Sequence, residues 1–332
     1  TVTKVSGAVG FSGLDIYSNY LITRSDNGVA LTGAELNAAD GTGVDVGSST
    51  NDISLIYQYP STTIHIIENL YVPTGHSFTT GGSVSLARSG YVDGTFTVGN
   101  NTMSVSGDFI VGSAGTFTHS NTLWLQPYDV SSGHQLFDPG VNTIASKIEI
   151  NTTNGPVTVT DHTVTLTGHA LNNGANSITI ASGSYFDLTT YNLTSTGTFS
   201  NNGTVKLAGS QTISITQDTD SGTWMYTGDN DGTVDTFTIK DFGTTDYYNL
   251  QFNDVSATSD IFEVSETGAI DLAVANDLTV TDGQLSLNTK YLDIGRDVTI
   301  ASAGLVAASG LANDRIEVAR NWSNSGTFTH GL

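Results

Sequence analysis

A repeated tetrapeptide, Gly94-Thr95-Phe96-Thr97, decides the fold class of this chain. Gly-Thr-Phe followed by Thr or Ser occurs again at Gly115 to Thr118, Gly197 to Ser200 and Gly326 to Thr329. Successive copies are separated by close to one, four and six times a common interval of about 21 residues, the size of one structural repeat. Recurrence at a short spacing is typical of stacked repeats, so the motif predicts a solenoid before any chemistry is considered.

Short runs with apolar and polar residues in alternation predict strands along most of the chain. Examples are Ser83 to Leu86, Met103 to Val105, Lys147 to Ile150 and Asp297 to Ile300. A period of two over three to five residues is the pattern of a short strand. Clusters of Gly, Asn and Asp between the runs favour turns. Helix formers are confined to residues 33–39 and 269–276, the second of which fits a strand at least as well, and we expect at most one short helix.

These patterns predict an all-β fold, a parallel β-solenoid with coils of about 20–25 residues. The alternative is a string of tandem β-sandwich domains, which also shows short strands separated by frequent turns. Residues 1–75 lack the motif and predict an N-terminal cap or assembly module. Residues 76–332 predict the solenoid, with insertions near 126–145 and 216–246. Because Thr1 is not an initiator Met, we expect a mature or excised fragment.

The charge balance excludes several classes of function. The chain has 32 acidic residues against 10 Lys and Arg, a formal net charge of -22, and no Cys. An acidic surface disfavours binding to nucleic acid or anionic lipid. The absence of Cys excludes disulfides, thiolate catalysis and Cys-ligated metals. No apolar run reaches the length of a membrane span, and we expect an extracellular or cell-surface location.

Several longer segments carry a resemblance to a known group of proteins. These are Tyr247 to Phe252, Asn276 to Asn288, Tyr291 to Ile300, Asn321 to Thr329 and Asn192 to Ile213. Together they resemble the β-solenoid repeats of very large secreted bacterial surface and adhesin-like proteins. The resemblance implies a structural, adhesive or filament-forming role outside the cell, and it implies no catalytic residues.

One loop has the composition of a calcium site. Gly228-Asp-Asn-Asp-Gly-Thr-Val-Asp235 interleaves Asp229, Asp231 and Asp235 with a Gly that permits a sharp turn. Carboxylate oxygens are the ligands that Ca²⁺ prefers, although the distal Glu of a full calcium-binding loop is missing. The alternative is a solvated turn. Calcium is the only cofactor that the sequence suggests.

Aromatic residues fall into two groups. Phe96, Phe117, Phe199 and Phe328 of the motif are expected in the core, stacked where coils are adjacent. Trp124, Tyr128, Trp224 and Tyr226 lie near the expected insertions and, if exposed, would contact glycans or a partner.

The sequence favours a non-enzymatic extracellular structural protein, a subunit or segment of a surface filament, sheath or stalk assembled through strand pairing. Its partners would be other copies of itself or surface glycans. A glycan- or cell-binding adhesin is the alternative. A polysaccharide-active β-helix enzyme is the least favoured, since only Asp293 and Asp297 offer a carboxylate pair and hydrated outer positions explain them equally well.

Overall fold

The chain forms a parallel β-solenoid, seen here in a computed structural model. The model describes residues 89–127, 134–151, 162–254, 256, 258–264, 272–310 and 314–330, and before them the short segments 44–45, 53–55, 65–67, 70–72, 74–75, 77–80 and 82–86. The regular elements of these residues are strands, with no helix among them. No helix in this part of the chain therefore has the length and apolarity of a membrane span. Of the two segments with helix formers, residues 33–39 lie outside the described residues, and the second contains the strand Leu272–Val274.

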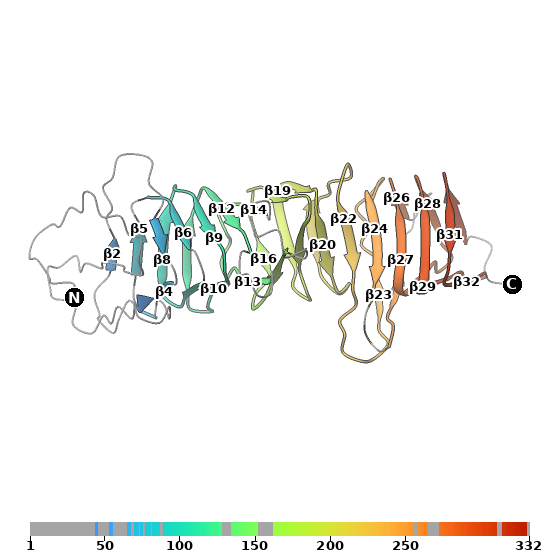
Figure 1. The fold of residues 1–332 in the computed structure, drawn as a ribbon, viewed down its shortest axis with the longest axis horizontal. Helices are drawn as coiled ribbons and strands as arrows, with labels where there is room; N and C mark the ends of the chain where they lie inside the picture. The colour runs from blue at the N-terminus through green and yellow to red at the C-terminus, as the bar shows by residue number, and fades with distance from the viewer. Residues whose placement is uncertain are drawn as a thin grey trace, which may run out of the picture. The chain divides into compact units, whose positions relative to one another are not determined.

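Two compact units divide the chain, Thr1–Ile178 and Thr179–Leu332. In the first unit, the stacked coils contribute strands to three sheets, and the second of these sheets ends at the coil that contains residues 116–119 (Figure 1). One sheet contains β1 (Val44–Asp45), β4 (Leu70–Val72), β7 (Gly90–Val92), β10 (Phe109–Val111), β13 (His134–Asp138) and β15 (His162–Leu166). The second contains β2 (Ile53–Leu55), β5 (Ser77–Thr80), β8 (Thr95–Gly99) and β11 (Thr116–His119). The third contains β3 (His65–Ile67), β6 (Val84–Leu86), β9 (Met103–Val105), β12 (Thr122–Leu125) and β14 (Lys147–Ile150). The short strands β16 (Leu171–Asn172) and β17 (Ile178–Ile180) follow.

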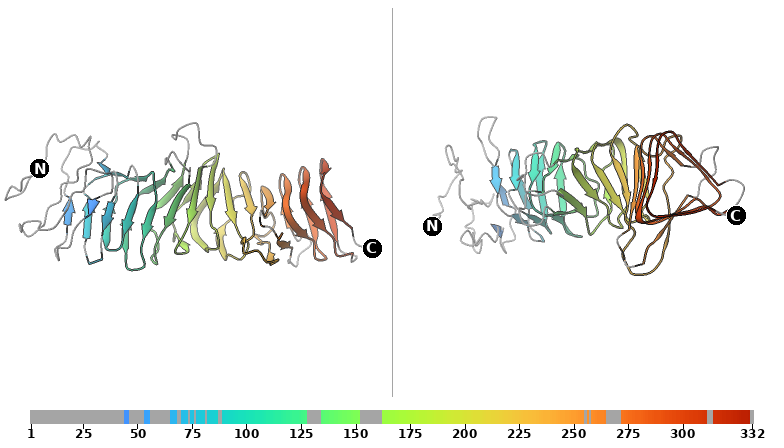
Figure 2. Two further views of the ribbon diagram at one scale, coloured as in Figure 1. Left: turned by 60° about the horizontal axis from the view of Figure 1, so that its bottom comes forward. Right: turned by 45° about the vertical axis from the view of Figure 1, so that its right-hand side comes forward.

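The second unit is also a stack of coils, and the last of them appear as three-sided loops in the right-hand view of Figure 2. One face contains β18 (Ser184–Asp187), β20 (Thr204–Leu207), β22 (Thr223–Tyr226), β24 (Asn249–Asn253), the first parts of β27 (Leu278–Ser286) and β29 (Val298–Ala307), and β31 (Trp322–Asn324). Another contains β23 (Thr236–Thr238), β25 (Ile261–Glu263), the second parts of β27 and β29, and β32 (Thr327–Thr329). A third contains β26 (Leu272–Val274), β28 (Tyr291–Ile294) and β30 (Arg315–Val318). The strands β19 (Leu193–Asn201) and β21 (Ile213–Thr216) pair with each other.

In each unit the neighbouring strands run parallel, as in β8 with β11, β9 with β12, β22 with β24 and β27 with β29, which excludes the β-sandwich alternative because sandwiches are built from antiparallel sheets. The offset between strand partners measures the length of a coil. Ser77 pairs with Thr95, whereas His134 pairs with Thr163. Coil length therefore varies between these pairs, from about 18 residues to about 29 residues, as repeats that carry different loops allow. The expected coil of about 20–25 residues lies in the middle of this range.

The alternating pattern of the sequence gives the solenoid its core. In β8 and β9 every second side chain is buried, including Phe96, Met103 and Val105 at 0% exposure. The apolar positions face inward because successive strand residues point to opposite faces. Coil stacking brings Phe96 and Phe117 together, with ring centroids 5.7 Å apart. The predicted packing of the motif phenylalanines is confirmed for this pair, and Phe199 is also buried, at 4% exposure.

The motif glycine has a steric role in addition to its place at a coil corner. Neither Gly115 nor Gly326 adopts a positive φ. Instead, a Cβ at Gly115 would overlap the carbonyl oxygen of Val92, and one at Gly326 would overlap that of Ala301. The motif therefore needs Gly where the backbone passes close to the preceding coil.

The segments predicted from the sequence to be a cap and two insertions also contain strands. In the first unit, β1 pairs with β4, and β13 pairs with β10 and β15. In the second, β22 pairs with β20 and β24. The connection from β22 to β23 leaves the stack and projects beside β23 (Figure 1). The domain boundary near residue 75 stays a prediction.

Candidate functional site

The last described coil leaves core positions uncovered. Ile316, Trp322 and Phe328 pair in register with Leu292, Val298 and Val306, which are each at most 1% exposed. Trp322 and Phe328 are nevertheless 41% and 38% exposed. We call Ile316, Trp322 and Phe328 the end face. Its side chains occupy inward positions of the coil, with no described residue stacked over them.

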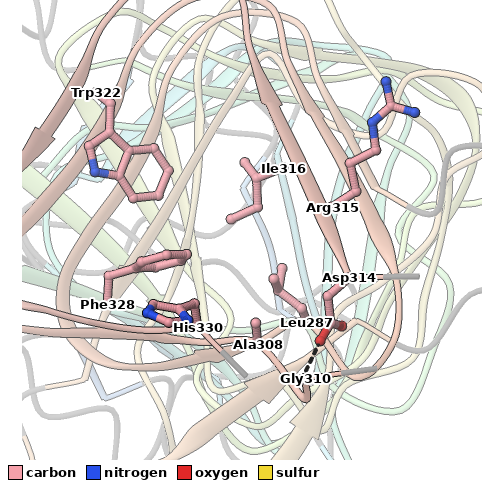
Figure 3. Close-up of a pocket in the computed structure, with 9 residues that line it drawn as sticks. All are labelled: Leu287, Ala308, Gly310, Asp314, Arg315, Ile316, Trp322, Phe328 and His330. Carbon is pink, nitrogen blue, oxygen red and sulfur yellow. Dashed lines mark hydrogen bonds between the residues drawn. The ribbon is translucent and has the colours of Figure 1, made fainter. Parts of the chain in front are cut away.

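The end face borders a cavity of about 450 Å³. Figure 3 shows the side chains of Ile316, Trp322 and Phe328 directed toward its centre, while Arg315 points away. The Trp322 and Phe328 rings meet edge to face, with centroids 5.2 Å apart. The remaining lining residues are Leu287, Ala308, Gly310, Asp314 and His330.

Polar groups hold the rim of this cavity. The Asp314 carboxylate accepts hydrogen bonds from the N–H groups of Thr289 and Gly310, both at 2.8 Å. Arg315 forms an ion pair with Glu317 and lies over the Tyr291 ring, 4.7 Å from its centroid. These charged groups thus have hydrogen-bond or ion-pair partners at the edge of the cavity, and the centre of the end face is apolar.

A second candidate site is a group of carboxylates contributed by the projecting loop and by the next coil. One carboxylate oxygen from each of Asp229, Asp235 and Asp260 lies within 4.8 Å of the other two. Asp229 is exposed, Asp235 is half-buried, and Asp260 is 1% exposed. Asp260 Oδ1 accepts a hydrogen bond from the Asp235 N–H at 2.8 Å.

Asp254 lies behind this group. Its Oδ2 accepts a hydrogen bond from the Asp260 N–H at 2.5 Å, and its Oδ1 accepts one from the Ser256 N–H at 3.0 Å. Burial raises the pKa of Asp260, and the charges of Asp254 and Asp229 raise it further. The Asp235 hydrogen bond and the nearby backbone N–H of Asp229 offset part of this rise. Oδ2 of Asp260 has no hydrogen-bond partner among the described residues.

No protein-family model, no curated protein and no solved structure matched this chain. The site is therefore interpreted from its own geometry.

The structure brings together two of the three predicted calcium ligands. Asp229 and Asp235 converge, but Asp231 does not join them. Instead, the Asp231 Oδ1 accepts hydrogen bonds from the N–H and Oγ1 of Thr233, both at 2.7 Å, and these bonds lower its pKa. Asp260 takes the third position. Thr236 pairs with Ile261, so Asp260 lies one coil beyond Asp235. The spacing of the coils is therefore the sequence signal from which Asp260 could have been predicted as a ligand.

The aromatic residues proposed as glycan or partner contacts are differently placed. Trp224 and Tyr226 are each 1% exposed inside the second unit, so they offer no ligand surface. They pair with the inward residues Val205 and Leu207 and share their side of the sheet. Trp124 is half-buried, and its Nε1 donates a hydrogen bond to Glu149 Oε2 at 2.6 Å. Tyr128 lies outside the described residues.

Proposed function

We propose that this chain is a non-enzymatic extracellular structural protein, a subunit or segment of a surface filament, sheath or stalk. In this proposal its coils associate end to end, and the end face is covered by a parallel coil of a second copy. The observation that carries the proposal is the exposure of Trp322 and Phe328 at positions that are buried one coil earlier.

The hydrogen-bonding edge of the last coil supports strand addition. Within the described residues, β30, β31 and β32 each pair on one side only, with β28 and β29. The edge of a parallel sheet presents N–H and C=O groups that a further strand can pair with. A second copy supplies the matching geometry, since the coils of this chain already pair with one another in parallel.

Hydrogen bonds between successive coils at one corner of the second unit also support the addition of a further coil at the end face. Asp277 Oδ1 accepts a hydrogen bond from the Asp297 N–H at 3.2 Å, and Asp297 Oδ1 accepts one from the Asn321 N–H at 3.1 Å. Each side chain thus receives the backbone of the next coil. Asn321 has an amide oxygen at the same position, suited to a coil that follows.

Composition supports the extracellular part of the proposal. Exported surface proteins are often rich in Gly, Ser, Thr and Asn and poor in Lys and Cys, as this chain is. The resemblance of its repeats to those of large secreted bacterial surface proteins points the same way. The adhesin alternative has less support, because two of its four proposed contact residues are buried.

Sedimentation velocity over a range of concentrations, followed by negative-stain electron microscopy, tests the proposal. The wild-type chain is expected to associate as concentration rises and to form elongated particles. Trp322→Lys places a charge on the end face and is expected to abolish association, because the charge would be buried without a partner.

Leu136→Lys is the matched control. Leu136 is 42% exposed, close to the 41% of Trp322, but it lies on β13 of the first unit and is not part of the end face. This variant carries the same change of charge and is expected to associate like the wild type. A wild-type chain that stays monomeric at every concentration, or equal loss of association in both variants, would rule out self-association through the end face.

A further inference from the structure

The carboxylates of Asp229, Asp235 and Asp260 converge without a basic side chain to balance them. Among the described residues, the ion pairs of His169, Arg296, Arg315 and Arg320 do not reach these three aspartates. Three like charges within 4.8 Å repel one another, and the repulsion grows where a carboxylate is removed from water.

An unpartnered oxygen provides a second, independent indication of a ligand. Oδ2 of Asp260 is inaccessible to solvent and accepts no hydrogen bond from any described residue. Buried polar atoms are almost always paired, so an orphaned carboxylate oxygen calls for a partner. Gly228 lies close against it, and a Cβ there would overlap Oδ2 and lie 3.0 Å from Asp254 Oδ1. The chain thus keeps side-chain atoms out of this space.

The geometry and ligand chemistry indicate the class of ligand. An ion about 2.4 Å from each oxygen holds its ligands no more than about 4.8 Å apart, and 2.3–2.6 Å is the range of Ca²⁺–oxygen distances. Carboxylate oxygens suit a hard divalent cation. Mg²⁺ requires near-ideal octahedral geometry at shorter distances, whereas Ca²⁺ accepts the irregular set that a loop and a strand connection supply.

We propose that Asp229, Asp235 and Asp260 bind one Ca²⁺ ion. Water would complete the coordination sphere. Asp254 would act as a positioning residue, because its carboxylate holds the Asp260 backbone N–H and adds negative charge nearby. This site is separate from the end face, so it holds or fails independently of the proposed self-association.

The ion would fasten two segments that meet at the projecting loop. Asp229 and Asp235 belong to the connection between β22 and β23, and Asp260 ends the connection between β24 and β25. These segments belong to successive coils and are already joined by the hydrogen bond from the Ile261 N–H to the Asp235 carbonyl oxygen, at 2.8 Å. Bound calcium would therefore connect the loop to the next coil and raise the stability of the second unit.

Calorimetric titration of the EGTA-treated full chain with CaCl₂, paired with thermal melts in CaCl₂ and in EGTA, tests the site. We expect a single site with a Kd on the order of 0.1–1 mM, the range of extracellular calcium modules, and a higher melting temperature with calcium. Asp260→Asn is expected to weaken binding by about tenfold or more, since it removes the buried charge. The Asn Oδ1 retains the bond from the Asp235 N–H, so the variant should melt in EGTA no lower than the wild type.

Asp231→Asn is the matched control, because Asp231 lies in the same loop but outside the cluster. It should bind calcium within about twofold of the wild type. Asp229→Asn is a second test at an exposed position, where a substitution leaves the fold intact, and it should weaken binding.

Four results would overturn the proposal: no calcium binding by the wild type, equal weakening in Asp231→Asn and Asp260→Asn, wild-type affinity in both Asp229→Asn and Asp260→Asn, or equal affinity for MgCl₂.

Discussion

The hydroxyl oxygens of Tyr226 and Tyr247 lie 2.8 Å apart in the fully buried core of the second unit. The Lys240 N–H donates to Tyr226 Oη at 2.9 Å, and the Tyr247 hydroxyl donates to the Lys240 carbonyl oxygen at 2.7 Å. Since Tyr247 uses its proton on Lys240, Tyr226 is the donor between the two rings. The three residues form a closed ring of hydrogen bonds in which every group is satisfied.

Breaking this ring should destabilise the second unit. Tyr247→Phe leaves the Lys240 carbonyl without a donor and the Tyr226 hydroxyl proton without an acceptor, at a cost of about 1–3 kcal/mol. The urea midpoint of the second unit, followed by the fluorescence of the buried Trp224, is expected to fall. In Tyr226→Phe with Tyr247→Phe, the loss should be smaller than the sum of the single losses, because both remove the same hydrogen bond. Additive losses would show that the ring does not act as a unit.

The same pair should make the protein sensitive to alkali. Burial raises the pKa of Tyr226 to about 12, and burial with the neighbouring phenol raises the pKa of Tyr247 well above 10. Between pH 10 and 12 the folded state therefore binds more protons than the unfolded state, and stability must fall as pH rises through this window. Absorbance titration at 295 nm should show Tyr226 and Tyr247 among the late-ionising members of the 13 tyrosines, together with Tyr91, whose pKa burial also raises, and in 8 M urea the delay should vanish. Simultaneous ionisation of all tyrosines in the native protein would contradict the assignment.

Protonation of His119 should lower the stability of the first unit at acidic pH. Its Nε2 donates to the Asn101 carbonyl oxygen and its Nδ1 accepts from Ser146 Oγ, both at 2.6 Å, in the neutral tautomer that satisfies both partners. Burial lowers the pKa of His119 below 6.5. The unfolded chain thus binds the proton first as pH falls, and stability is lost below about pH 6.5.

Thermal melts at several pH values between 7.5 and 5 measure this effect. His119→Gln, which does not titrate, should lose less of its melting temperature over this range than the wild type. Parallel curves for the two proteins would show that His119 contributes nothing to the acid response.

The motif glycine should tolerate no side chain. Gly115→Ala would force Cβ into the Val92 carbonyl, and we expect a loss of about 3 kcal/mol, at the upper end of overpacking costs. Gly99→Ala is the control in the same unit, because it has a φ of 65° but open space around it. Its cost should be about 1 kcal/mol, from backbone strain alone. Chemical denaturation compares them, and an equal loss in both would mean that contact with the preceding coil is unimportant.

Much of the fold follows from local sequence. Alternation in segments such as Met103-Ser-Val105 determines a strand with one buried face, and the tetrapeptide spacing indicates coils because each turn of a solenoid repeats the same environment. The inward position of Phe96 and Phe117 follows from the same alternation. These features depend on residues near one another in the chain.

The candidate sites depend on stacking between coils. The sequence groups Asp229, Asp231 and Asp235, but the register of β23 with β25 brings Asp260 beside Asp235, and a local turn with Thr233 takes Asp231 away. Alternation places Trp224 and Tyr226 on one face, and only pairing with Val205 and Leu207 turns that face inward. The repeating coil can be predicted from the sequence, since period and turns are local properties. Which carboxylates meet and which aromatics are buried can be known only from the folded chain, because both depend on the register between residues one coil apart.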